Sequence, residues 1–441
     1  MIVSERVSTI LKLALPASVG MFSTMVMEFI DLLMVGKLGA RSLAAIGIAG
    51  LSHVFVLSFV VNISPIIQGV VASQLGEGRR GALGSVLNGG LVAGLLIASP
   101  LVIICYWISP WYLALVSSDS FVAQEATPYF RVVIFASLAV GMNCCFEGFW
   151  RANGNTRVYM LIVIFANLLN IFLNYIFIFG NFGFPEFGVL GAGFGTFISL
   201  NAALLCWVVL ALRTKFASGF LFAKPSVVML KKLVTRTLTL SVGDAFFFLG
   251  MLVFFSIVAQ IGSAELAVVT VLARINLLLL IVPEAIGLAS ATLVANALGE
   301  GLSVQASQWG WDAGKMAFLA VLLLGLPLLL FPSSVLSVFF TDPKTINMAI
   351  TPLQLTAIFS SLISLIYVFG YILFSLGDGG RIMAISFILQ WLIFLPVAWF
   401  LGPQLSYGFL VVWSAYLIYG VVTAFCIVMV WVRGEWKKLE V

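Results

Sequence analysis

The sequence predicts an all-α membrane protein whose twelve transmembrane helices form two six-helix bundles related by a parallel repeat. Three observations support this fold class. Of the 441 residues, 62% are hydrophobic and only 9% are charged, whereas soluble domains carry about 25% charged residues. Apolar segments of helical length recur along the whole chain. Motifs of the first half also return in the second half at a nearly constant spacing.

Each apolar segment is long enough to cross a membrane as a helix. A spanning helix needs about 20 residues and a barrel strand about ten, and a backbone surrounded by lipid must satisfy its own hydrogen bonds. We therefore expect helices and no barrel strands. The twelve predicted helices are 10–35, 45–71, 84–108, 129–150, 158–179, 189–210, 233–261, 266–294, 316–340, 348–376, 382–400 and 409–432.

The basic residues predict the orientation. Most of the 22 Lys and Arg lie in or beside alternate connections, and only Lys37, Arg41, Arg131 and Lys344 fall on the opposite side. Cytoplasmic connections carry the excess of Lys and Arg, so we expect both termini in the cytoplasm of a prokaryote, with the chain in its inner membrane. This distribution disfavours a nucleic-acid partner. The five cysteines show no disulfide or metal spacing and are expected as small core residues.

An internal repeat divides the chain. The motif VASQLGEG at 71–78 returns as VANALGEG at 294–301, and TPYFRVVIFASL at 127–138 returns as TPLQLTAIFSSL at 351–362. Because each half has an even number of helices, both halves enter the membrane from the same side, as in alternating-access transporters with parallel repeats. We expect an N-terminal lobe (1–212), a cytoplasmic linker (213–232) and a C-terminal lobe (233–441).

Two acids stand inside the first predicted helix, where ionised groups are expensive. Glu28 and Asp31 share a helix face at a spacing of three residues, and acids in membrane helices are functional by default. By helical rise, Asn170, Asn174 and Thr196 fall at a similar depth near the outer face. We therefore expect these five side chains to form one polar cluster that binds and releases protons or contacts substrate.

Pro16 gives the first helix a place to bend, because proline lacks the N–H that would join the helical ladder. Our hypothesis is that protonation of Asp31 changes its bonds to the polar groups of the fifth and sixth predicted helices. The bend at Pro16 and the N-terminal cavity would then change together, and cargo would leave outward.

Several stretches resemble the multidrug and toxic compound extrusion (MATE) family. The first helix, LPASVGMFSTMVMEFIDLLMVGKLG, is similar to the family's opening helix, in which a carboxylate follows a proline and a V-G-x-L-G exit follows the carboxylate; here these are Pro16 and Asp31. LGEGRRG, PYFRV, FWRANGNTR and GVLGAGFGT resemble further family elements along essentially the whole chain. The resemblance implies a transporter rather than an enzyme: a proton-coupled antiporter that exports amphipathic or cationic drugs by alternating access.

One departure from the family pattern is informative. Members with a cation site in the C-terminal half resemble one another in a glutamate midway along helix 7 and an aspartate in helix 10. Here the seventh predicted helix has only Asp244, near its cytoplasmic third, and the tenth has no acid before Asp378 in the following turn. The chain therefore resembles the DinF-like branch, in which coupling rests on the N-terminal acid. This favours protons, although an acid–amide cluster also suits sodium.

The secondary candidate residues could have structural roles instead of functional ones. For His53, the only histidine, packing is favoured over a proton relay. Ten residues, or about 15 Å of rise, separate Arg274 from Glu284, which is too far for direct contact. Glu28 could pair with Arg131 or face an aqueous vestibule, and Asp244 could line an inward vestibule.

Two alternative functions remain open: a lipid-linked precursor flippase of the same fold superfamily, and a sodium-coupled exporter. Such flippases commonly have more helices and a basic cavity, whereas the expected cavity here is acidic. A membrane-embedded hydrolase lacks the necessary residues, because there is one histidine and no G-x-S-x-G motif. We expect a monomer with drug-like or cationic small molecules and membrane lipid as partners, and with no metal or other cofactor.

Overall fold

A computed structural model describes residues 4–116, 120–214, 217 and 219–438. Within this part of the chain all regular structure is helical, and eleven helices are long and apolar enough to span a membrane. The all-α membrane class is therefore confirmed. Residues 1–3, 117–119 and 439–441 of the predicted lobes, and 215, 216 and 218 of the predicted linker, lie outside the described residues. The lobe boundaries stay a prediction.

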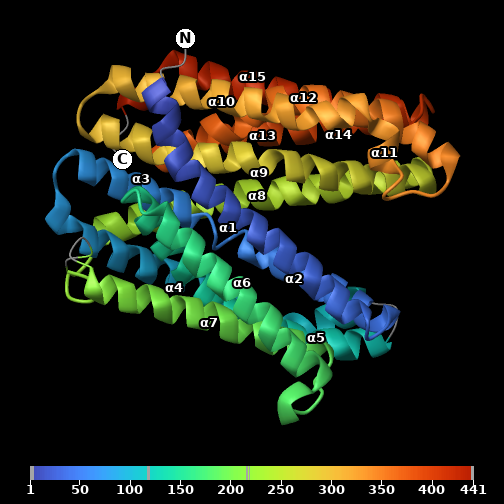
Figure 1. The fold of residues 1–441 in the computed structure, drawn as a ribbon, viewed down its shortest axis with the longest axis horizontal. Coiled ribbons are helices and arrows are strands. Elements are labelled where there is room, and N and C mark those ends of the chain that lie inside the picture. Colours follow the sequence, from blue (N-terminus) through green and yellow to red (C-terminus); the bar gives the residue numbers. More distant parts are fainter. Residues whose placement is uncertain (1–3, 117–119, 215–216, 218, 439–441) are drawn as a thin grey trace. The chain divides into compact units, whose positions relative to one another are not determined.

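The helices form two compact units, which we describe separately (Figure 1). The N-unit comprises Val19–Ser241 and the C-unit comprises Met1–Ser18 with Val242–Val441. The N-unit holds the later part of α1 (Ser4–Gly36), followed by α2 (Ala40–Leu57), α3 (Ile63–Gly76), α4 (Leu83–Val116), α5 (Ser120–Ala152), α6 (Thr156–Phe179) and α7 (Val189–Arg213).

The C-unit begins with the first part of α1 and most of α8 (Val227–Ile261). Arg6 ties the start of α1 to this unit: its guanidinium donates to Asp312 at 3.2 Å and lies 5.6 Å from the ring of Trp309. The remaining helices of the C-unit are α9 (Ser263–Gly299), α10 (Ser303–Leu330), α11 (Pro332–Leu336), α12 (Pro343–Leu376), α13 (Gly379–Phe387), α14 (Leu395–Trp399) and α15 (Phe409–Arg433).

Both units share one packing plan. In the N-unit α5 packs against α2, α3, α4 and α7, and in the C-unit α12 packs against α9, α10 and α15. These two central helices are the most buried of the spanning helices in the described chain. The sequence repeat is therefore also a repeat of helix packing.

A hydrogen bond between the central helix and its neighbour is repeated as well. His53 Nε2 lies 3.0 Å from Ser137 Oγ in the N-unit, and Ser360 Oγ donates to Asn276 Oδ1 at 2.8 Å in the C-unit. Asn276 lies 223 residues after His53, and Ser360 directly precedes Ser361, the residue that matches Ser137 in the repeated motif. This correspondence supports the packing interpretation of His53.

Three predicted helices were wrong in detail. The segment 45–71 is broken into α2 and α3. In the break, Asn62 donates its side-chain amide to Ser58 O at 3.1 Å, and backbone N–H groups turn to carbonyls three residues back. Side chains that bond to the backbone in this way compete with the helical ladder.

The other two corrections concern proline and π-helical turns. The segment 316–340 is not one helix, because α10 ends at Leu330 and α11 begins at Pro332; a residue before proline is pushed out of the helical region, and Phe331 has φ −130° and ψ 50°. The segment 382–400 extends over Gly379–Gln404 and contains π-helical turns at Ile388–Phe394 and Phe400–Gln404.

Small residues let α7 approach α6 closely. A Cβ atom at Gly191 would lie 2.5 Å from the backbone carbonyl of Phe177, and small residues at a spacing of four are a common basis of close helix packing in membranes. In GAGFG the second such glycine is Gly195. This approach sets the distance between the polar side chains of the two helices.

We predict that Gly191→Ala destabilises the protein by about 1–3 kcal/mol, because backbone atoms of α6 have to move to admit the methyl group. Gly50→Ala in α2 is the matched control, since nothing lies within 4 Å of a Cβ atom there. Thermal unfolding in detergent should show a lower unfolding midpoint for Gly191→Ala than for the wild-type protein. Gly50→Ala should not lower the midpoint. Equal midpoints for the two variants would contradict the close contact.

Candidate functional site

Four predicted polar residues meet between α1, α6 and α7, and we call them with Ser199 the Asp31 cluster. Asn174 Nδ2 donates to Asp31 Oδ1 at 2.8 Å and to Asn170 Oδ1 at 3.1 Å. Asn170 Nδ2 in turn donates to Thr196 Oγ1 at 3.3 Å and to Ser199 Oγ at 3.5 Å. The amides of α6 thus link the carboxylate of α1 to the hydroxyls of α7.

Helical periodicity and a glycine build this cluster. Asn170 and Asn174 are one turn apart on the same face of α6, and both are buried. Opposite them, a Cβ atom at Gly195 would lie 1.9 Å from Asn174 Oδ1. The amide of Asn174 therefore packs directly on the backbone of α7, and its N–H side is directed at Asp31.

Asn167 adds a second polar contact between α1 and α6 that the sequence reading missed. Its Nδ2 donates to Ser23 Oγ at 2.7 Å and to Thr24 Oγ1 at 3.1 Å. Asn167 precedes Asn170 by three residues, so the helical spacing that predicted the asparagine face contained the signal. The C-unit also has a contact from a side-chain amide to a neighbouring helix, because Gln390 Nε2 donates to Phe247 O of α8 at 3.1 Å.

Glu28 and Tyr129 flank the Asp31 cluster. Glu28 is exposed, and its charge acts on Asp31 one turn away. Tyr129 of α5, which the sequence reading also missed, packs against the buried side chains Val35, Ile178 and Ala192 and is within electrostatic range of Asp31. Asp31 itself is half-buried, so its surroundings are partly apolar and partly accessible.

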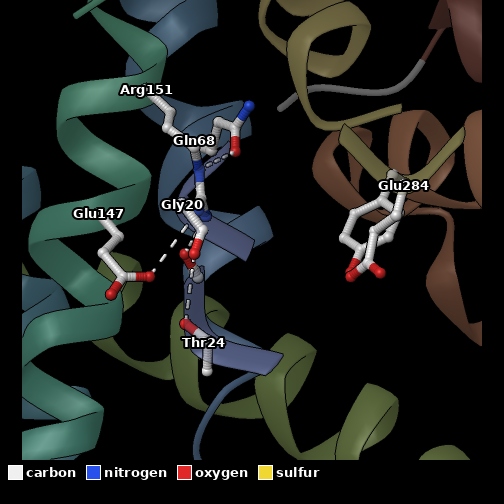
Figure 2. Close-up of polar contacts among 8 residues, drawn as sticks. Gly20, Thr24, Gln68, Glu147, Arg151 and Glu284 are labelled. Carbon is white, nitrogen blue, oxygen red and sulfur yellow. Dashed lines mark hydrogen bonds and ion pairs between the residues drawn. The ribbon is translucent and has the colours of Figure 1, made fainter. Parts of the chain in front are cut away.

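Pro16 lies inside α1, which is helical from Ser4 to Gly36. Just after it, between Ser18 and Val19, the helix passes from the C-unit to the N-unit. Polar side chains bond to the backbone of α1 on either side of this point: Ser18 Oγ donates to Ala14 O at 3.0 Å, and Thr24 Oγ1 donates to Gly20 O at 3.4 Å (Figure 2). Bending at Pro16 stays a prediction.

The secondary candidates do not join the Asp31 cluster. Arg131 Nε donates to Ser109 Oγ at 3.3 Å, and its guanidinium lies 4.6 Å from the ring of Tyr106. Glu284 accepts a hydrogen bond of 2.7 Å from Tyr371 Oη. Arg274 is exposed on α9 and Asp244 is half-buried on α8.

A buried arginine that the sequence reading left aside joins α3, α5 and α6. Arg151 donates to Gln68 Oε1 at 3.2 Å and to Ser64 Oγ at 2.5 Å, and its Nη1 lies 3.8 Å from Glu147 Oε2 (Figure 2). Its guanidinium lies 4.9 Å from the ring of Tyr159. These contacts satisfy a charge that would otherwise be costly in the membrane, and they join three helices of the N-unit.

The described residues contain no group of three or more His, Cys, Asp or Glu side chains that could hold a metal ion. The Asp31 cluster instead combines one carboxylate with amide and hydroxyl groups. Such a set can change its hydrogen bonds when the carboxylate gains a proton, because a protonated acid becomes a donor.

Comparison with known proteins agrees with this architecture. The MatE family model matches the chain twice, over residues 16–176 and 240–400, one match in each half. A probable multidrug resistance protein NorM of Thermotoga maritima is 25% identical over 100% of this chain and 95% of its own. The multidrug resistance protein NorM of Vibrio cholerae is 28% identical over 90% of this chain and 88% of its own.

A solved structure has the same fold. A multidrug resistance MATE family transporter of the MOP superfamily, in an outward-facing conformation, superimposes with a TM-score of 0.88 at 20% identity and covers 97% of this chain and 96% of that one. The spanning helices and these matches define an integral, multi-pass membrane protein. The chain belongs to the MatE family and is a transporter, not an enzyme. Its assignment to the DinF-like branch stays a prediction.

We predict that His53→Asn keeps the thermal stability and the pH profile of transport, because an asparagine occupies the matching position in the C-unit and also bonds to a serine of the central helix. His53→Leu, which removes the polar partner of Ser137, should lose about 1 kcal/mol of stability. The measurement is thermal unfolding together with uptake across a pH series. A shifted pH profile in a stably folded His53→Asn protein would indicate that the imidazole titrates during transport.

Proposed function

We propose that this protein is a proton-coupled antiporter that exports amphipathic and cationic drugs by alternating access, with Asp31 as the proton-binding residue. The observation that carries the proposal is the hydrogen bond of 2.8 Å from Asn174 to Asp31. The NorM relatives are named multidrug resistance proteins, which supports drugs as the cargo, and the carboxylate of Asp31 favours cationic ones. We further propose that the chain lies in the prokaryotic inner membrane with both termini in the cytoplasm, as its basic connections indicate.

The bonding around Asp31 supports exchange between two states. In the charged state, the carboxylate accepts from Asn174, and Asn174 is held by Asn170 and by Gly195. A proton on Asp31 removes the negative charge, so the hydrogen bond from Asn174 becomes a neutral and weaker one. Protonation therefore weakens the tie between α1 and α6. A drug cation that approaches the carboxylate favours release of the proton instead.

The same bonding supports a proton over sodium as the coupling ion. Hard cations are bound by several oxygen ligands, whereas Asn174 presents its N–H to the carboxylate. A proton moving inward contributes about 2.3 kcal/mol per 100 mV of membrane potential. That energy and the pH gradient together would drive export.

The attachments of α1 support its role as the moving element. It is the least buried of the spanning helices in the described chain. On the N-unit side, hydrogen bonds hold α1 to α6 at Asp31 and, through Asn167, at Ser23 and Thr24. Gly20 of α1 also packs against Tyr159. Pro16 precedes these attachments, so the loss of one tie near the far end would allow a bend at a point where one backbone hydrogen bond is already missing.

We predict that Asp31→Asn abolishes proton-driven uptake of a fluorescent lipophilic cation into inverted vesicles, because asparagine is isosteric but does not bind a proton. Glu28→Gln, the same change at the exposed acid one turn earlier, should keep proton-driven uptake. Proton and sodium gradients are imposed separately, and western blots normalise the amount of protein in the vesicles.

Uptake by Asp31→Asn in proportion to the proton gradient would contradict the proposed role of Asp31. Uptake driven by the sodium gradient alone would favour the sodium-coupled exporter. If the protein transports a fluorescent lipid-linked sugar but no cationic drug, the result would favour the alternative function of a lipid-linked precursor flippase.

A further inference from the structure

The connection between α7 and α8 presents large apolar side chains outward. The exposed fractions are 62% for Leu221, 87% for Phe222, 81% for Val227 and 79% for Val228. Phe222 is the most exposed of the large apolar side chains in the described chain. Leu221 and Phe222 lie in the turn before α8, outside the candidate membrane spans, so their exposure requires an explanation.

The turn that exposes them is a built feature of the N-unit. Asn88 of α4 donates through Nδ2 to Gly219 O at 3.2 Å and to Ala223 O at 2.8 Å, and it accepts from Leu221 N at 3.1 Å. One buried amide thus holds both ends and the middle of the turn. Leu221 has φ 68°, a backbone conformation that costs energy for a branched side chain and persists only where the surroundings enforce it.

Neighbouring phenylalanines point in opposite directions as a result. Phe220 is buried, and its ring lies 5.7 Å from that of Phe146 in an edge-to-face contact. Phe222 is turned outward by the positive φ of Leu221. The aromatic contact of Phe220 and the amide of Asn88 therefore fix the direction in which Leu221 and Phe222 project.

Basic side chains surround this apolar turn. Arg213, Lys224 and Lys231 are exposed, and the sequence has no acidic residue between Glu186 and Asp244. An apolar projection within a basic surface is the arrangement that binds a membrane interface, where apolar side chains insert among the headgroups and lysines attract anionic lipid. Basic residues that only set the orientation of the chain in the membrane would not require an exposed Phe222 in a turn held by Asn88.

We propose that the segment Leu221–Lys231 is an anionic-lipid binding site, with Phe222 inserted at the headgroup level and Lys224 and Lys231 on lipid phosphates. The apolar side chains of Val227 and Val228 in the first turn of α8 extend the same contact. This site fixes the connection between the two halves to the membrane surface. It is independent of the coupling ion and of the exported drug.

The test is photo-cross-linking of the full-length protein in vesicles of phosphatidylcholine with a minor fraction of phosphatidylglycerol. The photoreactive residue p-benzoyl-phenylalanine replaces Phe222, and in a matched control it replaces Val304. Val304 is also apolar and 71% exposed in the first turn of a helix, but its near sequence carries Glu300 and no lysine. Mass spectrometry identifies the adducts.

We expect lipid adducts at position 222 in which phosphatidylglycerol is enriched about fivefold over the vesicle composition, the preference that one lysine near a charged surface provides. Position 304 should show no such enrichment, and Lys224→Gln should reduce the enrichment at 222 while lipid adducts persist. Adducts at 222 that contain protein instead of lipid, or that match the vesicle composition as at 304, would overturn the proposal.

Discussion

A carboxylate inside a hydrocarbon layer has to be balanced, and the hydrogen bond from Asn174 to Asp31 is the contact on which the rest of the N-unit depends. Asn170 holds Asn174, the hydroxyls of Thr196 and Ser199 hold Asn170, and Gly195 gives the amide its place against α7. Because these residues come from α1, α6 and α7, a change in the charge of Asp31 changes the contact among three helices. We regard this as the physical basis of the proposed coupling.

The sequence predicted that Asp31, Asn170, Asn174 and Thr196 lie together, because helical rise gives the depth of a polar residue and periodicity gives its face. Glu28 was expected with them but is exposed, and Ser199 was not expected. The same reasoning applied to Asn167 would have found its contact with Ser23 and Thr24. The break between α2 and α3 and the π-helical turns near Gln390 were not predictable from hydropathy, because they depend on side chains that bond to backbone carbonyls. The buried Arg151 was missed for a related reason: its partners on α3 are distant in sequence.

The two halves share their packing but not their chemistry. His53 and Asn276 match at a spacing of 223 residues, and each bonds to a serine of the central helix of its unit. This interhelical contact therefore occurs in both halves with a different residue type. At the position that corresponds to Asp31, the C-unit has Phe254, which is fully buried and stacks on Tyr416 with ring centres 5.4 Å apart. An aromatic core has replaced the ionisable group, which is why we assign proton coupling to the N-unit alone.

The most direct test of this account is to measure protons released by the purified protein when a lipophilic cation binds. The protein is kept in weakly buffered detergent solution with a pH indicator, and binding is followed in parallel by fluorescence polarisation. We predict that binding to the wild-type protein releases protons into solution, and that Asp31→Asn binds the cation without releasing them. Equal proton release by Asp31→Asn, or binding to the wild type with no release across the physiological pH range, would contradict the central role of Asp31.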